Sequence, residues 1–592
     1  MSFRSPDGGG ALSRRTFVRG TALSGASLLM PGWTARADTQ AQTPQILSGT
    51  EFDLRIGRTP VNITGRTIMA PSVNGSVPGP TLRWRQGDIV TLRVHNALDE
   101  TSSIHWHGIR VPSEMDGVPG LSFAGIPAGQ KFTYRFPLHQ SGTYWYHSHS
   151  GFQEQQGLYG ALIVAPRAGE AQHAERDHVV VLSDWTDADP AGIVDNLKFQ
   201  SDYYNFRQRT VGTFFSDAAR DGLGPTIRDR LRWGRMRMSA TDIADVSGAT
   251  YTYLCNGQAP AANWTGLFRP GERVRLRFIN ASAMTLFDVR VPGLDMTVVQ
   301  ADGNDVEPFV VDEFRIGVAE TYDVIVRPLE IRAYTIFAQS EDRTGFARGT
   351  LSPRGGLAAP IPPMDPRPVR TMIDMGMGGM AGMDAGSAED RKAADHGDAM
   401  PGMAMDGMEM GSMPGPMSGP EPDSARLKGS IGVDNVAMMP RDRLDDPGDG
   451  LENNGRRVLT YAMLRATRPG ADPRPPSRDI VLHLTGNMER YIWGFDGKKF
   501  SQAEPIRVGL GERVRFVLIN DTMMEHPIHL HGLWSELENG EDAFRPYKHT
   551  VIVQPGERLS YLVTADVPGR WAFHCHLMYH MELGMFRTVV VA

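Results

Sequence analysis

One pattern occurs three times along this chain and constrains its fold more than any other feature. A Gly-Asp or Gly-Glu pair is followed by alternating polar and apolar residues and ends at asparagine, in residues 87–96, 271–280 and 511–520. Alternation with a period of two is typical of a β-strand with one buried face, and the leading glycine is typical of a turn. Copies this far apart predict three related β-domains and not a solenoid of short repeats.

The second interval between these copies is longer than the first, which predicts an insertion between the second and third domains. Residues 371–420 supply it, because they contain 12 of the chain's 30 Met together with many Gly, Pro and Asp residues. Helical content is expected to be low, since 65 Gly and 41 Pro favour turns. The sequence predicts a signal peptide at 1–37 and three β-domains at 45–166, 175–355 and 455–592. The Met-rich insertion, at 371–420, lies between the second and third domains.

Composition excludes several classes of function. The net charge is −7 without a basic block, which argues against nucleic acid as a partner. Two cysteines cannot form a disulfide framework or a cysteine-rich zinc or iron–sulfur site.

The N-terminus predicts where the protein is located. Ser-Arg-Arg-Thr-Phe at 13–17 precedes a weakly apolar stretch and the small-residue pattern Ala-Arg-Ala at 35–37. This arrangement resembles a twin-arginine export signal, and the stretch is too short for a membrane span. The sequence therefore predicts a periplasmic protein that is exported in the folded state by the twin-arginine machinery.

Histidines in His-x-His pairs occupy matching positions of the first and third repeats. The pairs are His105/His107, His147/His149, His529/His531 and His574/His576. The middle repeat has Val289 and Val291 where the first of these pairs would lie. Residues i and i+2 of a strand point to the same face, so each pair presents two imidazoles. Eight nitrogen ligands are too many for one zinc ion, which takes about four, and they predict a three-metal cluster.

Cys575 indicates which metal binds. It lies between His574 and His576, so its side chain points to the opposite face of the strand. Two His, one Cys and a weak axial Met are the ligands of a blue copper electron-transfer site, and His526, His580 and Met585 are near enough in sequence to supply them. One residue of backbone then separates this copper from the cluster.

These motifs, in this order and spacing, resemble those of the three-domain multicopper oxidases. The resemblance covers roughly 45–350 and 455–592. Residues 115–123 and 151–155, the export signal and the Met-rich insertion are most similar to the periplasmic copper resistance protein A branch. The resemblance implies an all-β fold of three cupredoxin-like Greek-key β-barrel domains, with the insertion between the second and third and the cluster between the first and third.

The resemblance also implies four copper ions, namely one type 1, one type 2 and two type 3. The implied ligands are His526, Cys575, His580 and Met585 for type 1, His105 and His529 for type 2, and His107, His147 and His576 with His149, His531 and His574 for the type 3 pair. Asp116 matches an acid that helps to deliver protons, although a turn-forming Asp-Gly is the alternative. Some relatives carry a second acid directly after the type 1 histidine; here Met581 follows it, which leaves the proton relay open.

The implied reaction passes single electrons from substrate through Cys575 to the cluster, where O2 is reduced to water. Thioethers select Cu(I), so Met403, Met405, Met408 and Met410 are candidates for Cu(I) capture, with a linker or core packing as alternatives. Met523 and Met524 are candidates for substrate docking, or they pack near the type 1 site. The leading hypothesis is oxidation of Cu(I) to Cu(II) for copper resistance, with periplasmic copper carriers as candidate partners. A laccase acting on small phenols and a copper-sequestering protein are the alternatives.

Overall fold

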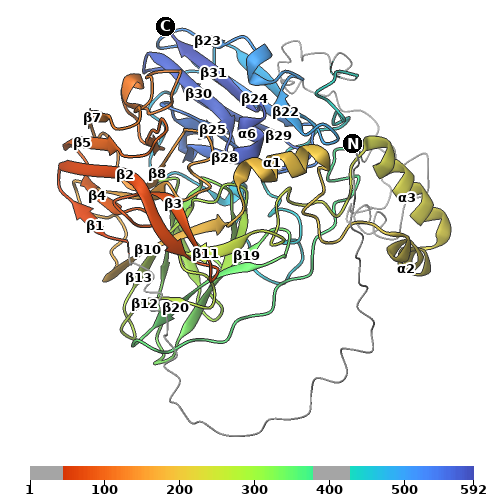
Figure 1. The fold of residues 1–592 in the computed structure, drawn as a ribbon, viewed down its shortest axis with the longest axis horizontal. Helices are drawn as coiled ribbons and strands as arrows, with labels where there is room; N and C mark the ends of the chain where they lie inside the picture. Colours follow the sequence, from red (N-terminus) through yellow and green to blue (C-terminus); the bar gives the residue numbers. More distant parts are fainter. Residues whose placement is uncertain (1–43, 378–426, 428) are drawn as a thin grey trace, which may run out of the picture. The chain divides into compact units, whose positions relative to one another are not determined.

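The computed structural model describes residues 44–377, 427 and 429–592. Over these residues the strands form six sheets, which group along the chain into three successive pairs (Figure 1). The predicted all-β architecture is thereby confirmed. The signal segment 1–37 and most of the Met-rich insertion lie outside the described residues.

The first pair of sheets carries the first two His-x-His pairs. Its strand orders are β1-β4-β9-β8-β6 and β3-β2-β5-β7. The strands are β1 (Ile46–Ser48), β2 (Glu51–Asn62), β3 (Thr67–Val73), β4 (Thr81–Arg85), β5 (Ile89–Asn96), β6 (His105–His107), β7 (Lys131–Pro137), β8 (Gly142–His147) and β9 (Tyr159–Ala165). Antiparallel pairing of β6 with β8 places His105 opposite His147.

The second pair of sheets has a similar plan without the His-x-His pairs. Its strand orders are β11-β10-β13-β18-β15-β16 and β12-β20-β19-β14-β17. The strands are β10 (Arg176–Trp185), β11 (Thr252–Cys255), β12 (Trp264–Leu267), β13 (Val274–Asn280), β14 (Phe287–Arg290), β15 (Met296–Ala301), β16 (Asn304–Val311), β17 (Glu313–Ile316), β18 (Thr321–Val326), β19 (Tyr334–Ser340) and β20 (Phe346–Ser352). Val289 lies opposite Ala338, where the other pairs of sheets have facing histidines.

The third pair of sheets carries the remaining histidines and Cys575. Its strand orders are β22-β21-β24-β29-β26-β27 and β23-β31-β30-β25-β28. The elements are β21 (Asp479–Asn487), β22 (Ile492–Phe495), β23 (Ile506–Val508), β24 (Arg513–Asn520), β25 (His526–Leu530), β26 (Ser535–Leu537), β27 (Tyr547–Lys548), β28 (Thr550–Val553), β29 (Arg558–Thr564), β30 (Gly569–Cys575), α6 (Met578–Glu582) and β31 (Phe586–Val591). In the β25–β30 ladder His529 faces His574, and Ile528 faces Cys575.

The asparagine that ends each repeat has the same buried role in all three copies. The Nδ2 groups of Asn96, Asn280 and Asn520 each donate to two main-chain oxygens, one in the following loop and one on a more distant segment. Each Oδ1 accepts from the main-chain N–H two residues on. Because these bonds fix the loop that leads into β6, β14 or β25, the repeat sets the place of the residues that follow it.

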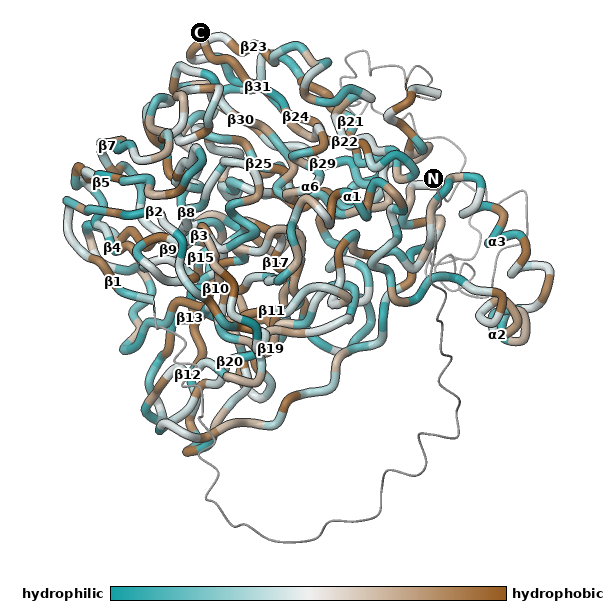
Figure 2. Tube along the Cα trace, in the orientation of Figure 1, coloured by the Kyte–Doolittle hydropathy of each residue, from teal (hydrophilic) through white to brown (hydrophobic). Residues whose placement is uncertain are grey.

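Helical content is low, as predicted, and three of the helices lie between β10 and β11. They are α1 (Pro190–Phe199), α2 (Val211–Asp221) and α3 (Leu223–Met236). Asp189 caps α1 and Thr210 closes a capping box on α2, so local start signals were present in the sequence. Figure 1 shows α2 and α3 beside each other, and both carry hydrophobic and hydrophilic residues (Figure 2). Among the described residues, no helix has the length and apolarity needed to span a membrane.

Candidate metal centre

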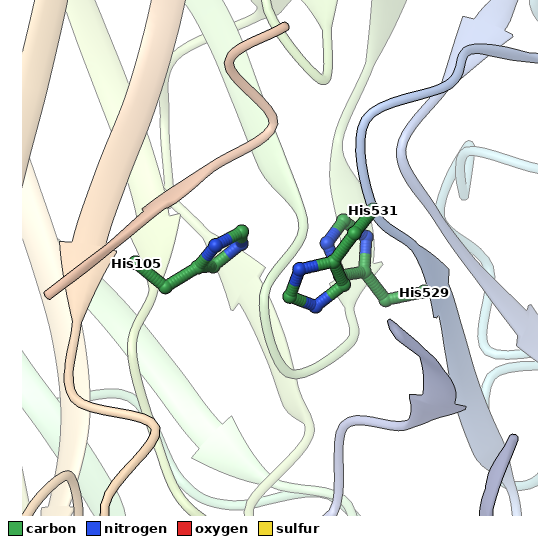
Figure 3. Close-up of side chains that lie close together, drawn as sticks. All are labelled: His105, His529 and His531. Atoms are coloured by element: carbon green, nitrogen blue, oxygen red, sulfur yellow. The ribbon is translucent and has the colours of Figure 1, made fainter. Parts of the chain in front are cut away.

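Side chains from the first and third pairs of sheets meet at a buried cluster of imidazoles. Figure 3 shows the ring of His105, which extends from β6, facing the rings of His529 and His531. The ring centroids of His105 and His531 lie 4.0 Å apart. The structure thus brings together residues separated by more than four hundred positions in the sequence.

The imidazole nitrogens fall into groups that could each hold a metal ion. Ligand atoms within each group lie within 4.8 Å of one another. The groups include His107/His147/His576, His149/His531/His574 and His105/His529/His531. Two of them contain the same residues as the two predicted type 3 sets, and the third contains the predicted type 2 pair.

Hydrogen bonds orient most of these rings in one way. Nδ1 of His105 donates to the main-chain oxygen of Asp116 at 2.7 Å, and Nδ1 of His574 donates to that of Cys575 at 2.9 Å. With Nδ1 held outward, Nε2 points inward. The inward Nε2 atoms that are buried without a hydrogen-bond partner are those of His105, His147, His149, His529 and His576.

Several observations show that this cluster fits bound metal. Burial, and then the neighbouring imidazoles, lower the pKa of His107, His529 and His576 well below the usual histidine range, so these rings are neutral, as metal ligands must be. Nε2 of His531 and Nε2 of His574 lie only 3.0 Å apart. Unprotonated nitrogen atoms that point at one another in a buried site without hydrogen-bond partners are unfavourable. A metal ion would bind these lone pairs and remove that cost.

A second group lies on the opposite face of β30. Sγ of Cys575 is 3.5 Å from Nδ1 of His526 and 3.8 Å from Nδ1 of His580, and all three side chains are fully buried. Met585 is also fully buried, and its main-chain oxygen accepts from the N–H of Cys575. Trp493 stacks on the His580 ring at 3.7 Å between centroids. The structure therefore brings all four predicted type 1 residues into one region.

Polar side chains outside the predicted set hold the histidines in place, and sequence reasoning missed three of them. Oε2 of Glu154 lies 2.5 Å from Nδ1 of His147, and Oδ2 of Asp245 lies 2.5 Å from Nε2 of His580. His549 contacts His107, and burial lowers its pKa to about 4. Glu154 lies in residues 151–155, a segment that already showed resemblance to a known branch. Asp245 and His549 do not occupy matching positions of the repeats, so nothing in the sequence indicated their role.

Asp116, which the sequence did predict, contacts two histidines of the cluster. Its main-chain oxygen accepts from His105, and its Oδ2 lies 2.8 Å from Nδ1 of His531. Its Oδ1 accepts no hydrogen bond but lies 3.3 Å from Nδ1 of His105, which makes a third contact. One residue thus joins histidines from the first and third pairs of sheets.

The predicted docking methionines differ in their surroundings. Met523 and Met524 are both buried, and Met523 lines a cavity. Sδ of Met524 lies 3.8 Å from the guanidinium of Arg370. Met403, Met405, Met408 and Met410 lie outside the described residues.

Comparison with known proteins identifies the family. Models of multicopper oxidase domains match residues 55–169, 176–355 and 473–592. A copper resistance protein A homolog of Pseudomonas syringae pv. tomato is 57% identical over 591 residues, which covers 98% of this chain and 99% of the relative. Copper resistance protein A of Escherichia coli is 56% identical over 604 residues, with the same coverage.

Solved structures show the same fold at low identity. Fet3p, a multicopper oxidase that functions in iron import, superposes with a TM-score of 0.63 at 17% identity, over 92% of this chain and 90% of that one. A laccase from Botrytis aclada superposes with a TM-score of 0.59 at 20% identity, over 93% and 89%. The three pairs of sheets are therefore cupredoxin-like domains. The chain belongs to the multicopper oxidase family, whose members carry four copper ions and couple the oxidation of substrate to the reduction of O2.

Proposed function

We propose that this multicopper oxidase oxidises Cu(I) to Cu(II) in the periplasm and so confers copper resistance. The observation that carries the proposal is a cavity of about 330 Å³ lined by Met238, Met488 and Met523 together with Asp202, Asp242 and Glu489, of which Glu489 is paired with Arg237 in the same lining. Thioether sulfur prefers Cu(I). Carboxylates attract either copper ion and are better ligands for Cu(II) than thioethers are. A phenol would gain no comparable advantage from the thioethers.

The cavity adjoins the type 1 ligands through two acids. Asp242 lines it, and burial followed by the nearby Asp245 raises the pKa of Asp242 well above the usual range. One oxygen of each carboxylate is buried without a hydrogen-bond partner, which a bound cation would relieve. The other oxygen of Asp245 contacts His580 and accepts from the hydroxyl of Tyr491 at 2.8 Å. Asp245 therefore connects the cavity to a type 1 ligand.

The two groups of side chains support an assignment of the copper ligands. His526, Cys575, His580 and Met585 would hold the type 1 copper. His105 and His529 hold the type 2 copper, and the two type 3 ions take His107, His147 and His576, and His149, His531 and His574. Bound copper supplies the one-electron redox chemistry and the reduction of O2. Cys575 contributes a covalent connection, because the peptide backbone joins it directly to His574 and His576.

Asp116 acts on protons at the cluster. Its Oδ2 accepts from Nδ1 of His531, and its second oxygen is buried, lies 3.3 Å from Nδ1 of His105 and accepts no hydrogen bond. A carboxylate in this position orients His531 and can hold a proton on Oδ1 for delivery to the cluster. A residue needed only for the Asp-Gly turn would not require its side chain to be buried between ligands.

The cavity predicts a selective effect on substrate. Replacing Met238 and Met488 with leucine should raise the KM for a chelated Cu(I) donor by about tenfold, or about 1.4 kcal/mol of binding, and leave oxidation of a methoxyphenol unchanged. Oxygen uptake with the two donors in parallel measures this. The control replaces the exposed Met438 and Met439 with leucine. Equal losses with both donors, or no loss with Cu(I), would contradict the proposal.

The proposed function requires export to the periplasm. The Arg14-Arg15 pair directs the folded protein to the twin-arginine machinery. Periplasmic copper carriers are the proposed partners that deliver the substrate. The methionines of the insertion, Met403 to Met410, capture Cu(I) for the enzyme. Replacing both arginines with lysine should retain the protein in the cytoplasm, as cell fractionation would show; an unchanged periplasmic fraction would contradict this route.

A further inference from the structure

A ninth histidine lies against the cluster. His549 stands between β27 and β28 and is buried. Its Nδ1 lies 3.2 Å from Nε2 of His107, and its main-chain oxygen accepts from Nδ1 of His529 at 2.5 Å. One residue thus contacts a predicted type 3 ligand from the first domain and a predicted type 2 ligand from the third.

The second domain, which contributes no histidine to the cluster, holds this residue in place. Oδ2 of Asp302 accepts from the main-chain N–H groups of His549 and Thr550, at 3.1 and 3.2 Å. The same oxygen lies 3.0 Å from Nζ of Lys548. Three contacts to one buried carboxylate fix the connector between β27 and β28, so the position of His549 depends on the second domain.

His107 is oriented in the opposite way to its neighbours. Its Nδ1 is the buried atom without a partner, whereas its Nε2 lies 3.2 Å from both His549 Nδ1 and Thr550 Oγ1. If Nδ1 of His107 binds metal, Nε2 must carry the proton and donate it to these acceptors. His549 and Thr550 therefore determine which nitrogen of His107 faces the cluster.

The same bond determines the tautomer of His549. Nδ1 of His549 lies 3.2 Å from Thr550 Oγ1 and 3.6 Å from Asp302 Oδ2 as well as near His107. If Nδ1 of a neutral His549 accepts from His107, its proton resides on Nε2, which is buried and has no hydrogen-bond partner. A Cβ atom at Gly108 would lie 2.5 Å from Cδ2 and 2.9 Å from Nε2 of His549, so this edge of the ring lies against the glycine. Gly108, His549, His105 and His529 all line one cavity of about 10 Å³, which is room for about one water molecule.

We propose that His549 is a positioning residue of the cluster with two tasks. Its Nδ1 and main-chain oxygen hold His107 and His529 in the tautomers that present nitrogen to metal. Its Nε2–H donates to a water molecule in the cavity beside the type 2 pair. The proposal rests on the ligand assignment made above and adds a residue outside that assignment.

Three substitutions separate these tasks. His549→Ala removes both side-chain bonds. His549→Asn keeps an acceptor near the position of Nδ1, and His549→Gln keeps a donor near that of Nε2. Copper per chain and the electron paramagnetic resonance signal of type 2 copper are measured, the blue type 1 absorption reports on folding, and His173→Ala, at an exposed histidine, is the control.

His549→Ala should retain the blue absorption and bind cluster copper about tenfold to a hundredfold more weakly. His549→Asn should recover the copper content but show an altered type 2 signal, whereas His549→Gln should not recover the copper. Native copper content and a native type 2 signal in His549→Ala would overturn the inference alone. If alanine also removes the blue absorption, equal copper contents in the asparagine and glutamine variants would overturn it. A wild-type protein without type 2 copper would overturn the ligand assignment as well.

Discussion

Replacing Cys575 with serine is expected to remove the blue absorption and to lower oxygen uptake with any donor by roughly a thousandfold or more, which corresponds to at least about 4 kcal/mol of barrier. The thiolate is the soft ligand that selects copper at the type 1 position, and a serine hydroxyl does not replace it. The substitution also removes the one side chain whose backbone leads directly to His574 and His576. Oxygen uptake with chelated Cu(I) and absorption spectroscopy measure both effects.

The other cysteine provides a matched control. Cys255 is as deeply buried as Cys575, and burial raises the pKa of both thiols. It lies on β11 in the second domain, among apolar side chains. Cys255→Ser should therefore keep full turnover, and a comparable loss there would mean that serine at Cys575 acts through folding.

The same variant separates catalysis from copper sequestration. Cells that produce Cys575→Ser keep the whole Met-rich insertion, so a protein that protects by binding alone would still support growth on copper. A protein that protects by oxidation would not. Growth of these cells at the wild-type level of copper tolerance would refute the proposed function even if turnover were abolished.

The repeat explains why so much of the cluster could be predicted. A strand fixes the direction of its side chains by parity alone, and the asparagine that ends each repeat is followed by a loop with the same hydrogen bonds each time. His105 and His529 could thus be matched by their equal distance from that asparagine. Val289 and Val291 are fully buried in the apolar core, as expected of a second domain without metal.

The residues that support the ligands could not be predicted in this way. Asp245 follows the helices inserted between β10 and β11 and reaches His580 of the third domain only through tertiary packing. His549 depends on Asp302 in the second domain. The alternation of side chains and the spacing of motifs predict geometry within one strand or one repeat. These contacts depend instead on how different domains pack against each other. Helices α1 and α2 have N-terminal capping residues that could be read from the sequence. The expectation of a β-rich chain nevertheless led to no prediction of helices there.

Replacing Lys548 with methionine should give the largest loss of stability. Its side chain is fully buried, with Nζ 2.7 Å from Oε1 of Glu320 and 3.0 Å from Oδ2 of Asp302. Methionine has a similar shape but leaves two buried carboxylates without their cation. Breaking a buried pair in this way costs about 3–5 kcal/mol, and here the loss includes the anchor of the β27–β28 connector. Urea unfolding of the copper-free protein would measure it.

An exposed ion pair supplies the comparison. Arg93 lies 2.6 Å from Glu51 and 3.3 Å from Asp53, and all three side chains are exposed, so Arg93→Met should cost less than about 1 kcal/mol. Equal unfolding midpoints for Lys548→Met and Arg93→Met would contradict the prediction. Because Asp302 also holds the N–H groups of His549 and Thr550, Lys548→Met should weaken copper binding at the cluster while the type 1 absorption persists. The second domain, which has no predicted metal ligands, would then control the metal centre through its buried carboxylates.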